Sequence, residues 1–113
     1  MNKRHLLRTG LCASIALLSA TWTQAQEFPP KKNVTIVVGF AAGGAADAAA
    51  RLIGKKLGDQ IGVPVIIDNK PGAGGNIAHQ YVAKSAPADG SVLLFGSVGP
   101  LSIAPHLMKL GYD

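Results

Sequence analysis

Three short apolar stretches, each followed by a glycine-containing loop, constrain the fold of this chain more than any other feature of its sequence. The stretches begin at Val34, Val65 and Val92, and the first is rich in β-branched residues and apolar on both faces. That pattern is typical of a strand buried in a parallel sheet. Segments with helical spacing separate the stretches, so we predict an α/β fold with a parallel sheet and right-handed crossovers.

The predicted elements follow one another without an internal repeat. Strands are expected at residues 34–40, 65–67 and 92–95. Helices are expected at residues 45–61, 76–85 and 101–108. The predicted apolar face of the first helix consists of Ala49, Leu52, Ile53, Leu57 and Ile61. That of the second helix consists of Ile77, Tyr81 and Val82.

Residues 1–25 are typical of a cleavable secretory signal. Basic residues precede an apolar run from Leu11 to Ala20, and we expect cleavage after Ala25. The run of about ten residues is well short of the roughly 20 that span a bilayer, so no direct membrane anchor is expected. Cys12, the only cysteine, lies in this signal, and the exported residues 26–113 therefore offer neither a disulfide nor a thiolate metal site.

The charge balance argues against a nucleic-acid partner. The formal net charge of +5 includes basic residues of the signal, and from Gln26 onward eight basic residues are balanced by six acidic ones. So small a surplus does not form the strongly basic face that nucleic-acid binding requires.

The glycine loops point to a ligand site. Loops after parallel strands share the carboxyl edge of the sheet, where open α/β sheets bind ligands. Gly43-Gly44 and Gly74-Gly75 each precede a predicted helix start, where backbone N–H groups and the helix dipole favour an anion, and a carboxylate is the sharpest inference. Alternatively, the glycines only supply turns with positive φ. Nucleotide binding is not expected, because the glycine spacings of phosphate-binding loops are missing.

Several polar residues have a structural and a functional reading. Asp47, in the first helical turn, is expected to cap free amides more than to contact a ligand. Asn76 is first an N-cap and second a ligand donor. His79 and His106 are expected in surface or packing roles, and Lys70 is the only cation inside a loop of the predicted site.

Catalysis finds little support in the sequence. The segment Gly96-Ser97-Val98-Gly99 misses the nucleophile-elbow pattern by one position, and no histidine or acid has a spacing that demands pairing with Ser97. We therefore expect no enzyme activity, no catalytic residue, no metal and no cofactor. The alternatives are an exported α/β hydrolase fragment with Ser97 as nucleophile, and a truncated product without function.

Four ordered motifs resemble a known family. They are Val34–Ala50, Asp68–Ile77, Pro87–Gly90 and Gly96–Pro105. Together they closely resemble the substrate-binding proteins of tripartite tricarboxylate transporters, also called the Bug (Bordetella uptake gene) family. The resemblance implies a periplasmic receptor, of the type II-like class with two α/β lobes, that delivers a small carboxylate to membrane transporter subunits. The ligand classes it implies are di- and tricarboxylates, acidic amino acids and aromatic acids.

The resemblance also implies which residues bind the ligand. In the family, a pincer of two loops holds a carboxylate largely through backbone amides and bridging waters, and these loops correspond to Phe40–Asp47 and Pro71–Asn76. The predicted ligand-binding residues are Phe40, Ala41, Ala42, Gly43, Gly44, Asp47, Gly74, Gly75, Asn76 and Ser97. Because family members are longer, we expect residues 26–113 to be an incomplete N-terminal lobe, truncated after about three strands.

Overall fold

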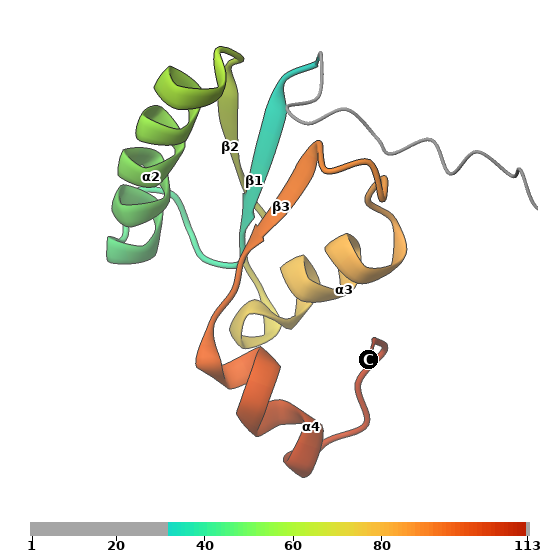
Figure 1. Ribbon diagram of the computed structural model, residues 1–113. Coiled ribbons are helices and arrows are strands. Elements are labelled where there is room, and N and C mark those ends of the chain that lie inside the picture. The colour runs from blue at the N-terminus through green and yellow to red at the C-terminus, as the bar shows by residue number, and fades with distance from the viewer. Residues whose placement is uncertain (1–31, 113) are drawn as a thin grey trace, which may run out of the picture.

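The fold is a parallel sheet with a helix on each face. The computed structural model describes residues 32–112, and the predicted signal sequence lies outside the described residues. The sheet consists of β1 (Val34–Val38), β2 (Val65–Asn69) and β3 (Val92–Phe95). The helices that connect these strands are α2 (Ala45–Ile61) and α3 (Asn76–Lys84) (Figure 1). The predicted α/β class is therefore confirmed.

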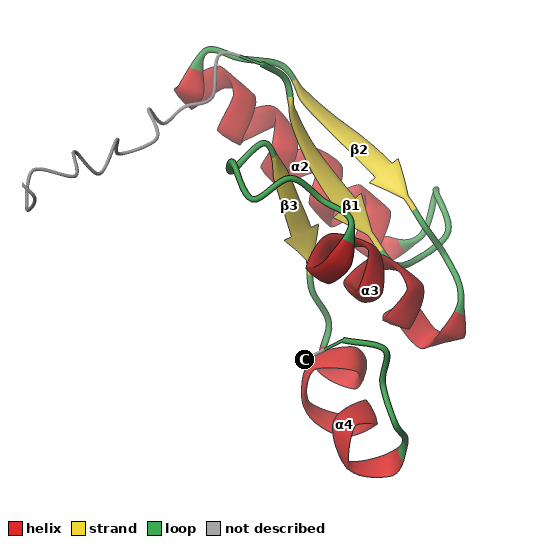
Figure 2. Ribbon diagram, turned by 90° about the vertical axis from the view of Figure 1, so that its right-hand side faces the viewer, coloured by secondary structure: helices red, strands yellow, loops and turns green. Residues whose placement is uncertain are grey.

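β1 lies in the centre of the sheet, between β2 and β3, and both pairings are parallel. Val34 is opposite Val65 of β2, and Thr35 is opposite Val92 of β3. The chain steps from β1 to β2 and then back across β1 to β3, so two crossovers of the same hand must lie on opposite faces. Figures 1 and 2 show this arrangement, with α2 on one face and α3 on the other.

Small residues form the face of α2 that packs on the sheet. Ala50 is fully buried in a core cluster with Ile36 and Val38 of β1. A Cβ atom at Gly54 would lie only 3.2 Å from the Ile67 side chain of β2. The helix backbone therefore approaches the sheet more closely than a face of large side chains would allow.

The predicted apolar faces of both helices are partly wrong. In α2, Leu52 is 62% exposed and Ile53 is 51% exposed, and in α3 Ile77 is 49% exposed. The buried residues of α3 include Ala78 and His79 instead. In α2, the sheet packs against the side that carries Ala50 and Gly54, whose small size permits close packing.

Two short helical turns follow β3, in place of the single helix predicted at residues 101–108. The turn η2 (Gly99–Ile103) is π-helical, and α4 (Ala104–Leu107) follows it directly. Pro100 and Ala104 are the buried residues of these two turns. Within residues 32–112, no helix combines the length and the apolar character needed to cross a bilayer.

Candidate functional site

Three loops meet at the carboxyl edge of the sheet, as the parallel strands predict. We call them the first loop (residues 40–47), the second loop (71–76) and the third loop (96–100), after β1, β2 and β3 in turn. A Cβ atom at Gly75 would lie 3.2 Å from Pro100, 3.6 Å from Ser97 and 3.8 Å from the Phe40 ring. One glycine of the second loop thus touches both of the other loops.

The strand order places this junction where ligands bind in other α/β sheets. The chain leaves β1 toward one side and later returns on the other side as β3. Loops after strands on either side of such a switch point diverge and leave a crevice at the carboxyl edge. The first and third loops are the pair that flank this switch point.

The predicted ligand-binding residues all lie in the three loops. Those exposed to solvent are Phe40, Ala41, Ala42, Gly43, Gly44 and Gly74. Those buried or partly buried are Asp47, Gly75, Asn76 and Ser97. The structure therefore gathers the predicted set at one edge, while their contact with a ligand stays a prediction.

The glycines of the helix starts differ in backbone conformation. Gly75, the N-cap of α3, has φ of +99°, and Gly74 before it has φ of +64°. Those values favour glycine over other residues, so the need for a turn with positive φ is enough to explain this pair of glycines. Gly44, the N-cap of α2, has φ of −83°, which any residue adopts. A turn requirement therefore leaves the glycine at position 44 unexplained.

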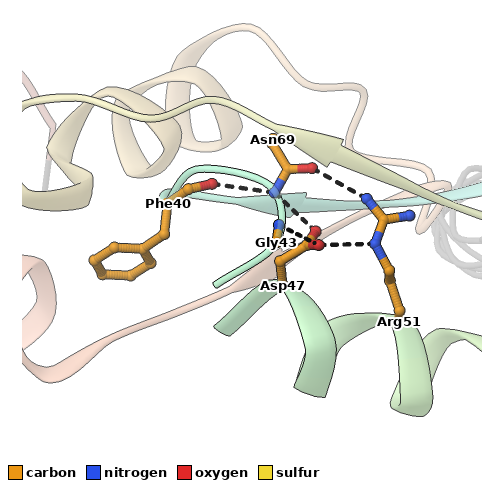
Figure 3. Close-up of polar contacts among 5 residues, drawn as sticks. All are labelled: Phe40, Gly43, Asp47, Arg51 and Asn69. Carbon is orange, nitrogen blue, oxygen red and sulfur yellow. Dashed lines mark hydrogen bonds and ion pairs between the residues drawn. The ribbon is translucent and has the colours of Figure 1, made fainter. Parts of the chain in front are cut away.

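Asp47 is the centre of a hydrogen-bonded cluster at the start of α2 (Figure 3). Its side chain is 5% exposed. One carboxylate oxygen accepts from the Gly43 amide and from Arg51 Nε, both at 2.9 Å, and the other accepts from Asn69 Nδ2 at 3.0 Å. Asp47 therefore bonds the Gly43 amide, one residue before the N-cap Gly44, and not one of the free helix amides that it was predicted to cap.

The cluster is ionised and internally neutralised. The hydrogen bond from Arg51, followed by those from the Gly43 amide and Asn69, holds the pKa of Asp47 well below its usual range although burial opposes this. The Asp47 carboxylate in turn raises the pKa of Arg51 through its hydrogen bond and its charge. An approaching anion consequently meets a paired carboxylate instead of an isolated negative charge.

Asn69 extends the cluster to the first residue of the first loop. Its Nδ2 also donates to the Phe40 carbonyl at 3.1 Å, and its Oδ1 lies 3.5 Å from Arg51 Nη2. The Phe40 ring points away from the cluster (Figure 3), so only its backbone takes part.

The N-cap role predicted for Asn76 is wrong. The N-cap of α3 is Gly75, and the Asn76 Oδ1 instead accepts from the Tyr112 hydroxyl at 2.7 Å. The Tyr112 ring also stacks on His79 with 6.0 Å between ring centroids. Asn76 thus fastens the segment after α4 to the start of α3.

The structure does not join Ser97 to a general base. His79 is buried in a packing role, and its Nδ1 lies 2.9 Å from the Gly75 carbonyl, so Nδ1 carries the proton in the neutral ring. Among residues 32–112, His79 Nε2 and Ser97 Oγ are both buried without a hydrogen-bond partner. A nucleophile and its base need a mutual hydrogen bond, which these two atoms do not make.

Lys70 has two partners outside the loop junction. Its Nζ lies 3.1 Å from an Asp68 carboxylate oxygen and 4.4 Å from the centre of the Tyr81 ring on α3. The charge of this cation is therefore already engaged by an acid and an aromatic face. Within the described residues, no cluster of three or more His, Cys, Asp or Glu could hold a metal ion.

Sequence reasoning missed three residues of this region: Arg51, Asn69 and Tyr112. The spacing of Arg51, four residues after Asp47, is a signal for a helical ion pair and could have been used. Asn69 and Tyr112 act on residues 29 and 36 positions away in sequence. Such long-range partners leave no signal in local spacing.

Comparison with known families and proteins gives one consistent result. Residues 49–113 match the model of the tripartite tricarboxylate transporter family receptor. A similar curated protein is a UPF0065 protein of Bordetella bronchiseptica, which is 42% identical over 110 residues, or 96% of this chain and 32% of the relative. The chain spans only 28–35% of the length of the first curated relatives it matches.

Two solved structures are similar to this chain and were determined with dicarboxylates. The R. palustris protein Rpa4515 with adipate is 45% identical with a TM-score of 0.60, and the match covers 65% of this chain and 24% of that protein. MatC from Rhodopseudomonas palustris with bound malate is 46% identical with a TM-score of 0.54, and the match covers 57% of this chain and 22% of that protein.

Proposed function

The chain belongs to the tripartite tricarboxylate transporter receptor family, and from this premise we propose that it is part of a periplasmic receptor for a small carboxylate. The receptor captures its ligand and delivers it to the membrane subunits of a tripartite transporter, without chemical change. In this proposal residues 1–25 are the export signal, cleaved after Ala25, and residues 26–113 contribute to one α/β lobe.

The convergence of the three loops around Gly75 is the observation that supports this proposal most strongly. It brings the start of α2, the start of α3 and Ser97 to one edge of the sheet. At the start of a helix the first amides have no carbonyl partner within the helix, and the dipole favours negative charge. Gly44 has no side chain to cover those amides in α2, which leaves room for a carboxylate.

Dicarboxylates are the ligands we propose to test first. The two similar proteins were determined with adipate and with malate, two dicarboxylates whose carbon chains differ in length. Backbone amides recognise the carboxylate group and not the rest of the molecule. The wider class of tricarboxylates, acidic amino acids and aromatic acids therefore belongs in the same panel.

Gly44→Thr tests the proposed role of the α2 amides. The φ of −83° suits threonine, and a Cβ atom would lie 3.6 Å from the Ala41 carbonyl, an ordinary contact. Threonine is a favourable N-cap, so its hydroxyl should bond the first-turn amides and keep the helix stable while it displaces the ligand. We expect the Gly44→Thr variant to bind adipate, malate and citrate at least tenfold more weakly than the natural protein, a difference of about 1.4 kcal/mol. Calorimetric titration of both proteins measures it.

Two further variants serve as controls for this experiment. Ala88→Thr introduces a threonine side chain in the exposed turn before β3, at the edge of the sheet opposite the proposed site. Lys70→Ala removes a cation that already has partners, so its effect on affinity is expected to be smaller than that of Gly44→Thr. If Lys70→Ala abolished binding while Gly44→Thr left it unchanged, a charge-paired site away from the helix starts would replace the proposed one.

A further inference from the structure

We propose that Asn69 is a positioning residue that couples the first and second loops, so that both loops move as one unit when a carboxylate binds. The ligand in this inference rests on the proposed function. The coupling itself rests on the contacts among the described residues.

The orientation of the Asn69 amide is determined by its neighbours. Its Nδ2 donates to two acceptors, the Phe40 carbonyl at 3.1 Å and the Asp47 carboxylate at 3.0 Å. A flipped amide would present its oxygen to both of these acceptors, which is unfavourable. The side chain therefore ties the first residue of the first loop to the first turn of α2.

The backbone of Asn69 determines where the second loop begins. Asn69 is the last residue of β2, and the next amide, that of Lys70, donates to the Val38 carbonyl at the end of β1 at 2.8 Å. The second loop starts immediately afterwards, at Pro71. One residue thus holds the first loop through its side chain and carries the second loop on its backbone.

The second loop also touches the residue that precedes the first loop. A Cβ atom at Gly39 would lie 2.9 Å from Gly75 Cα, so the backbone before the first loop is in direct contact with the second loop. Movement of the first loop relative to β2, which carries the second loop, must break the Asn69 hydrogen bonds. Movement of the second loop toward Gly39 would cause a collision at this contact. A carboxylate that fixes either loop should consequently fix both.

Exchanging the carboxylate of Asp47 with the amide of Asn69 separates the effect of Asn69 on ligand binding from its effect on the stability of the fold. Asn69→Asp places an acceptor against both the Phe40 carbonyl and the Asp47 carboxylate. The double variant Asp47→Asn with Asn69→Asp restores an amide–carboxylate pair of the same total charge, with a carboxylate still near Arg51. It does not restore a donor to the Phe40 carbonyl. Asp59→Asn, which breaks the exposed Lys55–Asp59 pair on the same helix, is the matched control.

The expected results differ between urea unfolding, which measures stability, and ligand titration, which measures affinity. Asn69→Asp should lower the urea midpoint and weaken binding of adipate or malate about tenfold or more, because the buried Asp47 carboxylate loses its donor and faces a second acceptor. The double variant should recover most of the lost stability but remain about tenfold weaker in binding. Asp59→Asn should bind with unchanged affinity. The inference is overturned if Asn69→Asp binds as tightly as the natural protein, or if the double variant recovers affinity together with stability.

A ligand-free measurement separates this inference from the proposed function. The Gly43 amide, bonded to Asp47, reports on the first loop, and the Gly75 amide, bonded to the Gly72 carbonyl, reports on the second. Hydrogen exchange should accelerate at both amides in Asn69→Asp and at neither in Asp59→Asn. Acceleration at Gly43 alone would show that the loops are independent. If the natural protein binds no carboxylate of the panel, the proposed function fails, and the exchange result still decides the coupling.

Discussion

Charged side chains in this molecule are held by specific neighbours, and the neighbours determine what each charge can do. Asp47 is buried and bonded on both oxygens. Asp89, at the opposite edge of the sheet, accepts from the hydroxyl and the amide of Ser91 and pairs with Lys32. Both carboxylates are therefore stabilised in their ionised form, and both connect folding to pH.

Asp89 is expected to make stability depend on pH in the acid range. The Ser91 hydroxyl, the Ser91 amide and then Lys32 lower the pKa of Asp89 to about 2, whereas the unfolded value is about 3.9. Because the folded pKa is the lower one, the contribution is complete above about pH 4 and is lost as the pH falls through about 2. Urea unfolding at several pH values should give a smaller acid dependence for Asp89→Asn.

Two variants identify the source of this effect. Ser91→Ala removes the hydroxyl that contributes most to the low pKa, and Lys32→Ala removes a smaller contribution. The acid dependence should therefore decrease more in Ser91→Ala than in Lys32→Ala. A pH profile of Asp89→Asn identical to that of the natural protein would contradict this assignment.

Ser97 distinguishes a receptor from a hydrolase. Its Oγ is buried at the loop junction and makes no hydrogen bond within the described residues. Ser97→Ala should weaken carboxylate binding at most a few-fold, because it removes one hydroxyl and no charge. Titration with malate or adipate checks this expectation. Ester turnover by the natural protein that disappears in Ser97→Ala would instead establish a nucleophile.

At the scale of elements, the sequence predicted the first and last residues of helices and strands better than it predicted which face of a helix is buried. The bounds of α2 and β3 agree with the prediction, since Gly44, Gly62 and Pro64 mark the ends of α2. β1 ends at Val38, two residues early, and β2 extends to Asn69, two residues late. The buried face of α2 could not be read from the sequence, because close packing by Ala50 and Gly54 depends on the opposing strand.

The same limit applies to the site. The sequence predicted that three glycine loops share one edge, because this follows from parallel strands alone. It did not predict that Asn69 bonds Asp47, since Asn69 reaches it only after β1 and β2 are paired. The residues that end helices and strands can thus be identified from the sequence, and contacts made across the sheet cannot.

Gly39→Ala should push the residue before the first loop away from Gly75 of the second loop. Its Cβ atom would lie 2.9 Å from Gly75 Cα and 3.2 Å from the Gly75 carbonyl, and backbone cannot move aside as a flexible side chain can. We expect a loss of about 1–3 kcal/mol in the free energy of unfolding, the usual cost of overpacking. Urea denaturation measures it. Gly99→Ala, where a Cβ atom would meet nothing within 4 Å, is the control and should change stability little.

On the scale of the whole molecule, the described residues 32–112 have a small core and much exposed apolar surface. Among the described strands, β2 and β3 each have one edge without a neighbouring strand. Large apolar side chains are exposed after β3, namely Val98, Leu101, Ile103, Leu107 and Met108. Exposed apolar surface and free strand edges both favour association.

We therefore expect the isolated segment 26–113 to unfold with weak cooperativity or to associate. Sedimentation velocity combined with thermal unfolding checks both outcomes, since association raises the sedimentation coefficient with concentration. A monomer with a sharp two-state transition would show that the three-strand sheet is sufficient for independent stability.

The meeting of three loops at Gly75 has an evolutionary consequence. A Cβ atom at this position would crowd Pro100 at 3.2 Å and lie in ordinary contact with Ser97 and the Phe40 ring, so a larger side chain would disturb all three loops at once. Ala41 and Ala42 lie on the exposed surface of the first loop, away from this junction. Divergence toward new ligands is therefore open to the outer positions, while the junction can change only through several mutations that arise together.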